Sequence, residues 1–229
     1  MPFTYTIQPL LPPDYVEAFS VADAAFADLN SLLYTKYPPS LKSKANLTKA
    51  RLKAIKTMRE ATMFKAVDDY TKRIVGVARW VVATEDEEVE ESIDDFVDDI
   101  MKRSVPETNK YAMRSFYRMA TKGKWDILGL QDRNGDVVRL RRRVELETLV
   151  THPEYQGKGV ASALLQWGID EADRLNLMVY LEATEAGKPL YKRFGFDTVH
   201  EMDFDAAEYG GIGKQRYTFM IRYPKDDQV

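Results

Sequence analysis

The sequence predicts an α/β domain, on three observations from different parts of the chain. Residues 3–8 alternate between apolar and polar side chains, as a half-buried strand does. Residues 160–175 instead repeat apolar side chains at every third or fourth position, which is typical of an amphipathic helix. With 229 residues, of which 45% are hydrophobic and 30% charged, the chain can bury a substantial core. We therefore expect one domain spanning residues 1–229.

The first third of the chain predicts one strand, two helices and a hairpin. Three prolines at positions 9, 12 and 13 end the first strand, and Asp14 is a suitable cap for a helix that runs to about Tyr34. An apolar stripe predicts a second helix over Leu47 to Glu60. Residues 62–67 and 74–83 are rich in strand-forming side chains and flank a polar turn, which predicts a hairpin.

Residues 85–124 carry a strongly segregated charge pattern. Ten of the fifteen residues 85–99 are acidic, yet an apolar helical stripe runs through them. Basic residues follow, interleaved with aromatic and Met side chains: Tyr111, Met113, Phe116, Tyr117 and Met119. One interpretation is a pair of helices whose opposite charges pair across their solvated faces. The other is a lid whose aromatic and Met side chains line a ligand pocket.

The remaining elements alternate between strands and short helices. Residues 131–136 predict a turn before the Arg-rich segment 139–143, and the following apolar residues predict a strand up to Thr151. Residues 178–184 are mostly apolar, and residues 187–196 end in a Gly-Phe pair.

The segment 156–161, Gln-Gly-Lys-Gly-Val-Ala, contains the most informative motif. Two glycines within three residues let the backbone approach a ligand closely, and the following helix begins with amides that attract an anion such as a diphosphate. The pattern matches neither the P-loop nor the dinucleotide-binding fingerprint. A glycine turn that only caps a helix is the alternative interpretation.

This motif resembles the acyl-CoA-binding segment of the GCN5-related N-acetyltransferases, the GNAT family, whose Gln/Arg-x-x-Gly-x-Gly/Ala signature falls on Gln156, Gly159 and Ala161. The likeness continues through strand 178–184 to a helix ending in Tyr-x-x-x-Gly-Phe, and it is greatest for fungal small-molecule acetyltransferases. It implies a mixed, mostly antiparallel sheet of about seven strands with helices on both faces. Residues 85–124 then form a helical insertion.

The resemblance implies acetyl-CoA as the acyl donor and a set of residues that bind it. Where many members carry Asn and Ala before the tyrosine, this chain has Thr184 and Gly187, which puts the contacts of that Asn in question. Tyr191 matches the tyrosine that protonates the departing sulfur. The cofactor-binding residues implied are Leu149, Val150, Thr151, Gln156, Gly157, Lys158, Gly159, Val160, Ala161, Thr184, Lys188, Tyr191 and Lys192.

Two carboxylates on the strand before the glycine motif are candidate bases. Strand alternation predicts that Glu145, Glu147, Leu149 and Thr151 share one face. Burial suits a carboxylate to accept a proton from an amine, and Glu147 is preferred over Glu145 because it lies nearer the cofactor. The alternatives are that each pairs with an arginine of segment 139–143 or with a cationic substrate. His152 precedes a proline and is assigned a structural role, with a base role as the fallback.

Composition excludes several other kinds of site. The chain has no cysteine and only two histidines, His152 and His200, so we expect no disulfide and no metal site. A net charge of −3 and the lack of a long apolar run argue against nucleic-acid and membrane partners. We expect a cytoplasmic monomer or homodimer that acetylates a small-molecule amine. The alternatives are a protein lysine or N-terminal acetyltransferase and a non-catalytic acyl-CoA sensor.

Overall fold

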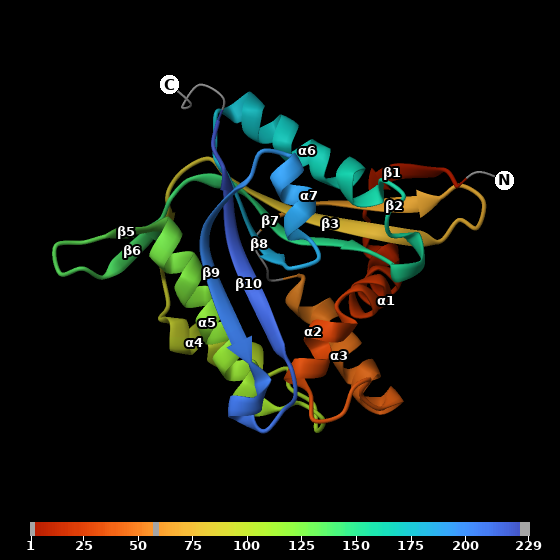
Figure 1. The fold of residues 1–229 in the computed structure, drawn as a ribbon, viewed down its shortest axis with the longest axis horizontal. Helices are drawn as coiled ribbons and strands as arrows, with labels where there is room; N and C mark the ends of the chain where they lie inside the picture. Colours follow the sequence, from red (N-terminus) through yellow and green to blue (C-terminus); the bar gives the residue numbers. More distant parts are fainter. Residues whose placement is uncertain (1–2, 57–59, 225–229) are drawn as a thin grey trace.

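A twisted seven-stranded sheet forms the centre of the computed structural model, which describes residues 3–56 and 60–224 (Figure 1). Neighbouring strands are antiparallel except for β7 and β8, so the predicted mixed and mostly antiparallel fold class is confirmed. The order across the sheet is β1 (Tyr5–Pro9), β2 (Thr62–Asp68), β3 (Ile74–Ala83), β7 (Arg143–Thr151), β8 (Val179–Thr184), β10 (Lys214–Arg222) and β9 (Asp197–Asp205). A small second sheet has the order β4 (Glu87–Glu88), β6 (Val137–Leu140) and β5 (Gly129–Gln131).

Helices cover both faces of the large sheet, as predicted (Figure 1). On one face lie α6 (Val160–Leu175) and α7 (Lys188–Arg193). On the other lie α1 (Tyr15–Ala25) and α5 (Lys110–Leu128), with α2 (Ala27–Leu33), α3 (Leu41–Ala54) and α4 (Ile93–Met101) beside them. The apolar stripe of α6 packs on Trp80, Val144 and Leu146. Gly168 permits this contact, since a Cβ there would lie 2.3 Å from the fully buried Trp80 ring.

Two predicted helices have different bounds in the structure. The helix expected from Asp14 to Tyr34 is divided at Phe26 into α1 and α2. The helix expected from Leu47 begins earlier, at Leu41, because the Ser40 side chain caps it by accepting a hydrogen bond from the Ser43 amide. The helix also ends earlier than the expected Glu60, at Ala54; residues 57–59 of the expected range lie outside the described residues.

Residues 85–124 contain α4 and most of α5, which pack against each other. Arg114 forms an ion pair with Asp98 at 2.5 Å, and Arg118 forms one with Asp94, so the interpretation of charge pairing between two helices is confirmed. Phe116 and Tyr117 of α5 face inward, whereas Tyr111 is exposed, and Phe116 contacts Phe204 and Tyr217 edge to face. Phe116 and Tyr117 therefore belong to a core between α2, α5 and β9.

A β-bulge changes which side chains of β7 share a face. In its register with β3, Thr148 lies opposite Arg79 and Leu146 lies opposite Trp80, so Glu147 is an extra residue. As a result Leu149 packs with the core under α6, while Val150 packs with the core under α1. The prediction that Glu145, Glu147, Leu149 and Thr151 share one face was therefore wrong, because the bulge interrupts the alternation.

Strands β7 and β8 separate soon after they meet. They are paired in parallel only over Val144–Leu146 and Val179–Leu181, although β7 continues to Thr151 and β8 to Thr184. The two strand ends therefore border a gap in the sheet. No helix in the described part of the chain combines the length and apolar character needed to cross a membrane.

Candidate active site

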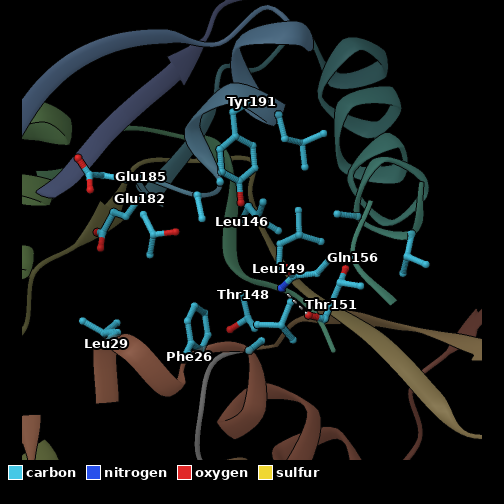
Figure 2. A pocket seen from close by; sticks show the side chains of 18 of the residues that line it. Phe26, Leu29, Leu146, Thr148, Leu149, Thr151, Gln156, Glu182, Glu185 and Tyr191 are labelled. Atoms are coloured by element: carbon cyan, nitrogen blue, oxygen red, sulfur yellow. Dashed lines mark hydrogen bonds between the residues drawn. The ribbon is translucent and has the colours of Figure 1, made fainter. Parts of the chain in front are cut away.

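A cleft of about 890 Å³ occupies the gap between β7 and β8. Its walls come from β7, the loop and first turn leading into α6, β8, α7, β10 and the junction of α1 and α2. Because α6 and α7 cover one face of the sheet and α1 and α5 the other, the gap connects the two faces. Figure 2 shows Tyr191 above the gap, Gln156 and Thr151 at one end, and Phe26, Leu29, Glu182 and Glu185 at the other.

The glycine motif forms the loop before α6 and, with the first turn of that helix, directs backbone amides into the cleft. The backbone φ angles of Gly157 and Gly159 are +73° and +85°, a conformation that residues other than glycine rarely adopt. Gly159 is the N-cap of α6, and no described side chain caps the helix. Val160, Ala161 and Ser162 of the first turn line the cleft, where their amides lack helical partners. The arrangement supplies backbone donors and the positive end of a helix dipole to an anion.

Gln156 ties this loop to the end of β7. Its Nε2 donates a hydrogen bond of 3.2 Å to the carbonyl oxygen of Thr151, the contact drawn as a dashed line in Figure 2. Thr151 is buried, and its Oγ1 has no hydrogen-bond partner among the described residues although the residue lines the cleft. His152 is not part of the described lining; its Nδ1 accepts a hydrogen bond of 3.4 Å from the Glu154 amide, in line with a structural role.

The structure brings most of the predicted cofactor-binding residues into the cleft. Those that line it are Leu149, Val150, Thr151, Gln156, Gly157, Gly159, Val160, Ala161, Thr184 and Tyr191. The three predicted lysines are not among the described lining residues. Lys158 donates to the Glu154 carbonyl at 2.9 Å and lies over the rings of Phe3 and Tyr155, Lys188 pairs with Glu201, and Lys192 borders a separate hollow.

Tyr191 reaches the gap from α7. Its ring is 7% exposed and packs edge to face on Phe196, with 5.8 Å between the ring centroids. In Figure 2 the hydroxyl points from α7 toward Leu146 on β7. Burial raises the pKa of Tyr191 above its ordinary value, because the surroundings disfavour the phenolate. The side chain therefore carries its proton throughout the neutral range.

Both predicted carboxylates line the cleft, but each has a cationic partner. Glu147 forms an ion pair with Arg79 of β3, a partner outside the segment that the sequence suggested. Glu145 accepts hydrogen bonds from the Arg143 guanidinium at 2.7 and 2.9 Å and from Lys124 at 2.5 Å. The expected alternative of pairing with segment 139–143 thus holds for Glu145.

Glu182 is a third carboxylate in the cleft, and the sequence analysis missed it. It lies on β8, and its Oε1 accepts a hydrogen bond of 3.0 Å from the Tyr180 hydroxyl. Burial raises the pKa of Glu182 to about 7; the charge of Lys124 lowers it and that of Glu145 raises it. The sequence pattern that could have identified it is a single acidic residue inside the apolar strand 178–184. The same kind of pattern identified Glu145 as a candidate.

The wall of the cleft beyond the carboxylates comes from unexpected segments. Phe26 and Leu29 at the junction of α1 and α2 line it, as does Tyr217 of β10. No residue of 85–124, all of which the structure describes, lines the cleft, so the lid interpretation was wrong. The inward-facing aromatic side chains of α5 are used in core packing instead. Among the described residues, no cluster of three or more His, Asp or Glu side chains could hold a metal ion.

Comparison with known proteins identifies the domain. Residues 126–198, which span β7, the glycine motif, β8 and α7, match the family model of the Acetyltransferase (GNAT) domain. This part of the chain is similar to a GNAT acetyltransferase domain. The GNAT match thus includes the strands on both sides of the gap and Tyr191.

Sequence and structure relatives agree with the GNAT assignment. A stretch of 44 residues is 36% identical to a probable acyltransferase, SID5, of Ajellomyces capsulatus, and the match covers 19% of this chain and 32% of that protein. A mosquito arylalkylamine N-acetyltransferase-like protein has a TM-score of 0.61 at 13% identity, covering 96% of this chain and 100% of its own. A histone acetyltransferase HPA2-related protein of Corynebacterium glutamicum has a TM-score of 0.57 at 20% identity, covering 99% of both chains. At these identities the structural matches establish the GNAT fold.

Proposed function

We propose that the protein is an N-acetyltransferase that transfers an acetyl group from acetyl-CoA to the amine of a small molecule. The proposal takes residues 1–229 as one GNAT domain, with 85–124 inserted. The observation that supports it most directly is the gap between β7 and β8. The first turn of α6, which is suited to an anion, lies on one face of this gap, and a wall lined by carboxylates lies on the other. Donor and acceptor can then meet inside the sheet from opposite sides.

The residues at the donor end suit acetyl-CoA. The backbone of 156–161 would hold the diphosphate, because its amides and the dipole of α6 favour negative charge. Leu149, Val150 and Thr151 would hold the pantetheine arm along the free edge of β7, as an added strand would lie. Thr151 Oγ1 offers this arm a hydroxyl that is buried and still has no described partner. Thr184 borders the same space.

The nucleotide end involves the basic residues around α7. Lys158, Lys188 and Lys192 remain predicted contacts for phosphate oxygens, and each would have to leave the position it has here. Arg193 of α7 already lines the cleft and is a further candidate. A guanidinium suits phosphate because it donates two parallel hydrogen bonds.

Acyl transfer needs a neutral amine, a stabilised oxyanion and a proton for the departing sulfur. A main-chain amide at the end of β7 would stabilise the oxyanion, a type of contact worth about 3 kcal/mol in other enzymes. Tyr191 donates its proton to the sulfur as the carbon–sulfur bond breaks, and it regains a proton from the nitrogen of the new amide. A carboxylate of the strand walls removes the first proton from the ammonium; the sequence favours Glu147, with Glu145 second.

The acceptor end favours a small cationic molecule over a protein tail. A cavity of about 890 Å³ is of the size that binds small ligands. Phe26, Leu29 and Tyr217 supply apolar wall, and Asp28 and Glu185 add carboxylates near its exposed rim. Alkylamines and arylalkylamines combine an apolar body with a positive charge, which suits such a wall.

Two measurements test the proposal. Calorimetric titration with CoA should show binding, and free thiol should be released from acetyl-CoA with at least one member of a panel of amines, polyamines, amino sugars and peptides. Binding without thiol release on any acceptor would favour a sensor, and release with peptides alone would favour a protein acetyltransferase. Lack of CoA binding would overturn the proposal altogether.

A further inference from the structure

The carboxylate that removes the proton from the amine can be chosen from the contacts around the gap. Three glutamates line it close to the sheet: Glu145 and Glu147 on β7 and Glu182 on β8. A useful base must be ionised often enough to accept a proton and must bind that proton well. The charges that each glutamate faces therefore distinguish the three.

The two β7 glutamates face cations at contact distance. Arg143 is fully buried and donates two hydrogen bonds to one oxygen of Glu145, while Lys124 donates to the other. Glu147 pairs with the buried guanidinium of Arg79. A positive partner at this distance favours the charged carboxylate and opposes its protonation. Protonation would also break these ion pairs with buried guanidinium groups, which is costly.

Glu182 has different surroundings. Its hydrogen bond comes from the neutral Tyr180 hydroxyl, and it makes no ion pair among the described residues. The titratable groups that face it are Tyr180 on its own strand, Glu145 on β7 and Lys124 on α5, and Lys124 already pairs with Glu145. Tyr217 of β10 lies near it as well. A carboxylate in this position can take up a proton without breaking an ion pair.

We propose that Glu182 is the general base that deprotonates the acceptor amine, a role that rests on the proposed N-acetyltransferase function. Glu182 takes one proton from the bound ammonium and passes it to water. The neutral nitrogen then forms a bond with the thioester carbonyl carbon, and the carbon–sulfur bond breaks. Tyr191 protonates the sulfur and is reprotonated from the amide nitrogen. One proton is released overall.

The position and proton affinity of Glu182 both suit this step. It extends from β8 on the face that also carries Tyr180 and Glu145, which is the face with Phe26 and Leu29 (Figure 2). An acceptor amine entering from that side would therefore meet Glu182 at the gap. With a pKa of about 7, Glu182 is ionised in about half of the molecules at neutral pH and still binds a proton far better than an exposed carboxylate.

The test is the pH profile of kcat/KM for four Glu→Gln variants, measured with an amine that the wild type acetylates. In the wild type, kcat/KM should rise with pH up to a plateau, with a midpoint near 7, far below the pKa of about 10 of a free alkylamine. Glu182→Gln should lower kcat/KM by at least about 100-fold and remove this midpoint. Glu145→Gln and Glu147→Gln should retain it. Glu171→Gln, on the surface of α6, should match the wild type.

The outcomes separate this inference from the proposed function. If the wild type releases thiol and Glu182→Gln keeps the midpoint near pH 7, the base is another group, and the acetyltransferase proposal still stands. If Glu147→Gln or Glu145→Gln loses the midpoint instead, that residue is the base. A slow Glu182→Gln variant that keeps the midpoint and has a lower melting temperature would show a structural role. Failure of the wild type on every amine would count against the proposed function first.

Discussion

The half-buried carboxylate of Glu182 should make the protein less stable as the pH rises through the neutral range. Its pKa is raised from 4.5 to about 7, chiefly by burial. Between these values the unfolded chain has lost the proton while the folded protein holds it. Because the folded state then binds more protons, the free energy of unfolding must fall with increasing pH. The contribution is fully present below pH 4.5 and is lost as the pH rises through about 7.

The size of the effect follows from the two pKa values. A shift from 4.5 to about 7 corresponds to a loss of about 2.5 kcal/mol between pH 5 and pH 8. Urea unfolding of the wild type and of Glu182→Gln over this range measures it. The difference in free energy of unfolding, variant minus wild type, should increase by about this amount as the pH rises. Any change in strength of the hydrogen bond from Tyr180 adds a nearly constant offset, which cancels in the comparison.

A matched variant separates this effect from general titration. Glu185 also lines the cleft but is exposed, so Glu185→Gln should follow the wild type at every pH. If the difference between Glu182→Gln and the wild type stays constant from pH 5 to pH 8, Glu182 is not the desolvated carboxylate described here. The choice of Glu182 as the base would then lose its electrostatic support.

Three further substitutions test the donor side and the core. Tyr191→Phe should lower kcat by about 10²- to 10⁴-fold, with CoA affinity unchanged by calorimetry; wild-type turnover would exclude the acid role. Gly159→Asp should weaken CoA binding at least about tenfold, because it places a side chain and a negative charge at the start of α6. The control is Gly135→Asp, a substitution at positive φ in a remote turn, which should bind CoA normally. Gly168→Ala should cost about 1–3 kcal/mol in urea unfolding, since its Cβ would meet the Trp80 ring at 2.3 Å, and unchanged stability would contradict this packing.

Local patterns in the sequence predicted the elements of this fold well, because each pattern reports a local constraint. The hairpin expected over 62–67 and 74–83 forms β2 and β3 almost to the residue. The glycines at 157 and 159 occupy the positive-φ positions that the turn into α6 needs. The bulge at Glu147 was missed because it is a property of the register between β7 and β3, which a single strand does not reveal.

Features that depend on distant contacts were harder to predict. Phe26 and Leu29 line the cleft, although they precede β7 and β8 by more than 100 residues in the sequence. No local pattern in the sequence distinguishes them. The basic partner of Glu147 is Arg79 on a neighbouring strand, whereas the sequence pointed to the arginines just upstream. The aromatic residues of α5 had the right composition for a ligand pocket, but their neighbours in space make them core. Composition alone does not distinguish these two uses of an aromatic side chain.

The gap between β7 and β8 would keep the two proposed substrates on opposite faces of the sheet. On one face, the loop into α6 and the helix α7 supply the groups suited to the thioester. On the other, the junction of α1 and α2 supplies Phe26 and Leu29, which are not among the residues proposed to hold the donor. Under the proposed function, we expect exchange of residues at this junction to alter which nucleophile is accepted while the affinity for the activated acyl carrier stays constant. The scaffold is in this sense modular, with an interchangeable half for the molecule that is modified.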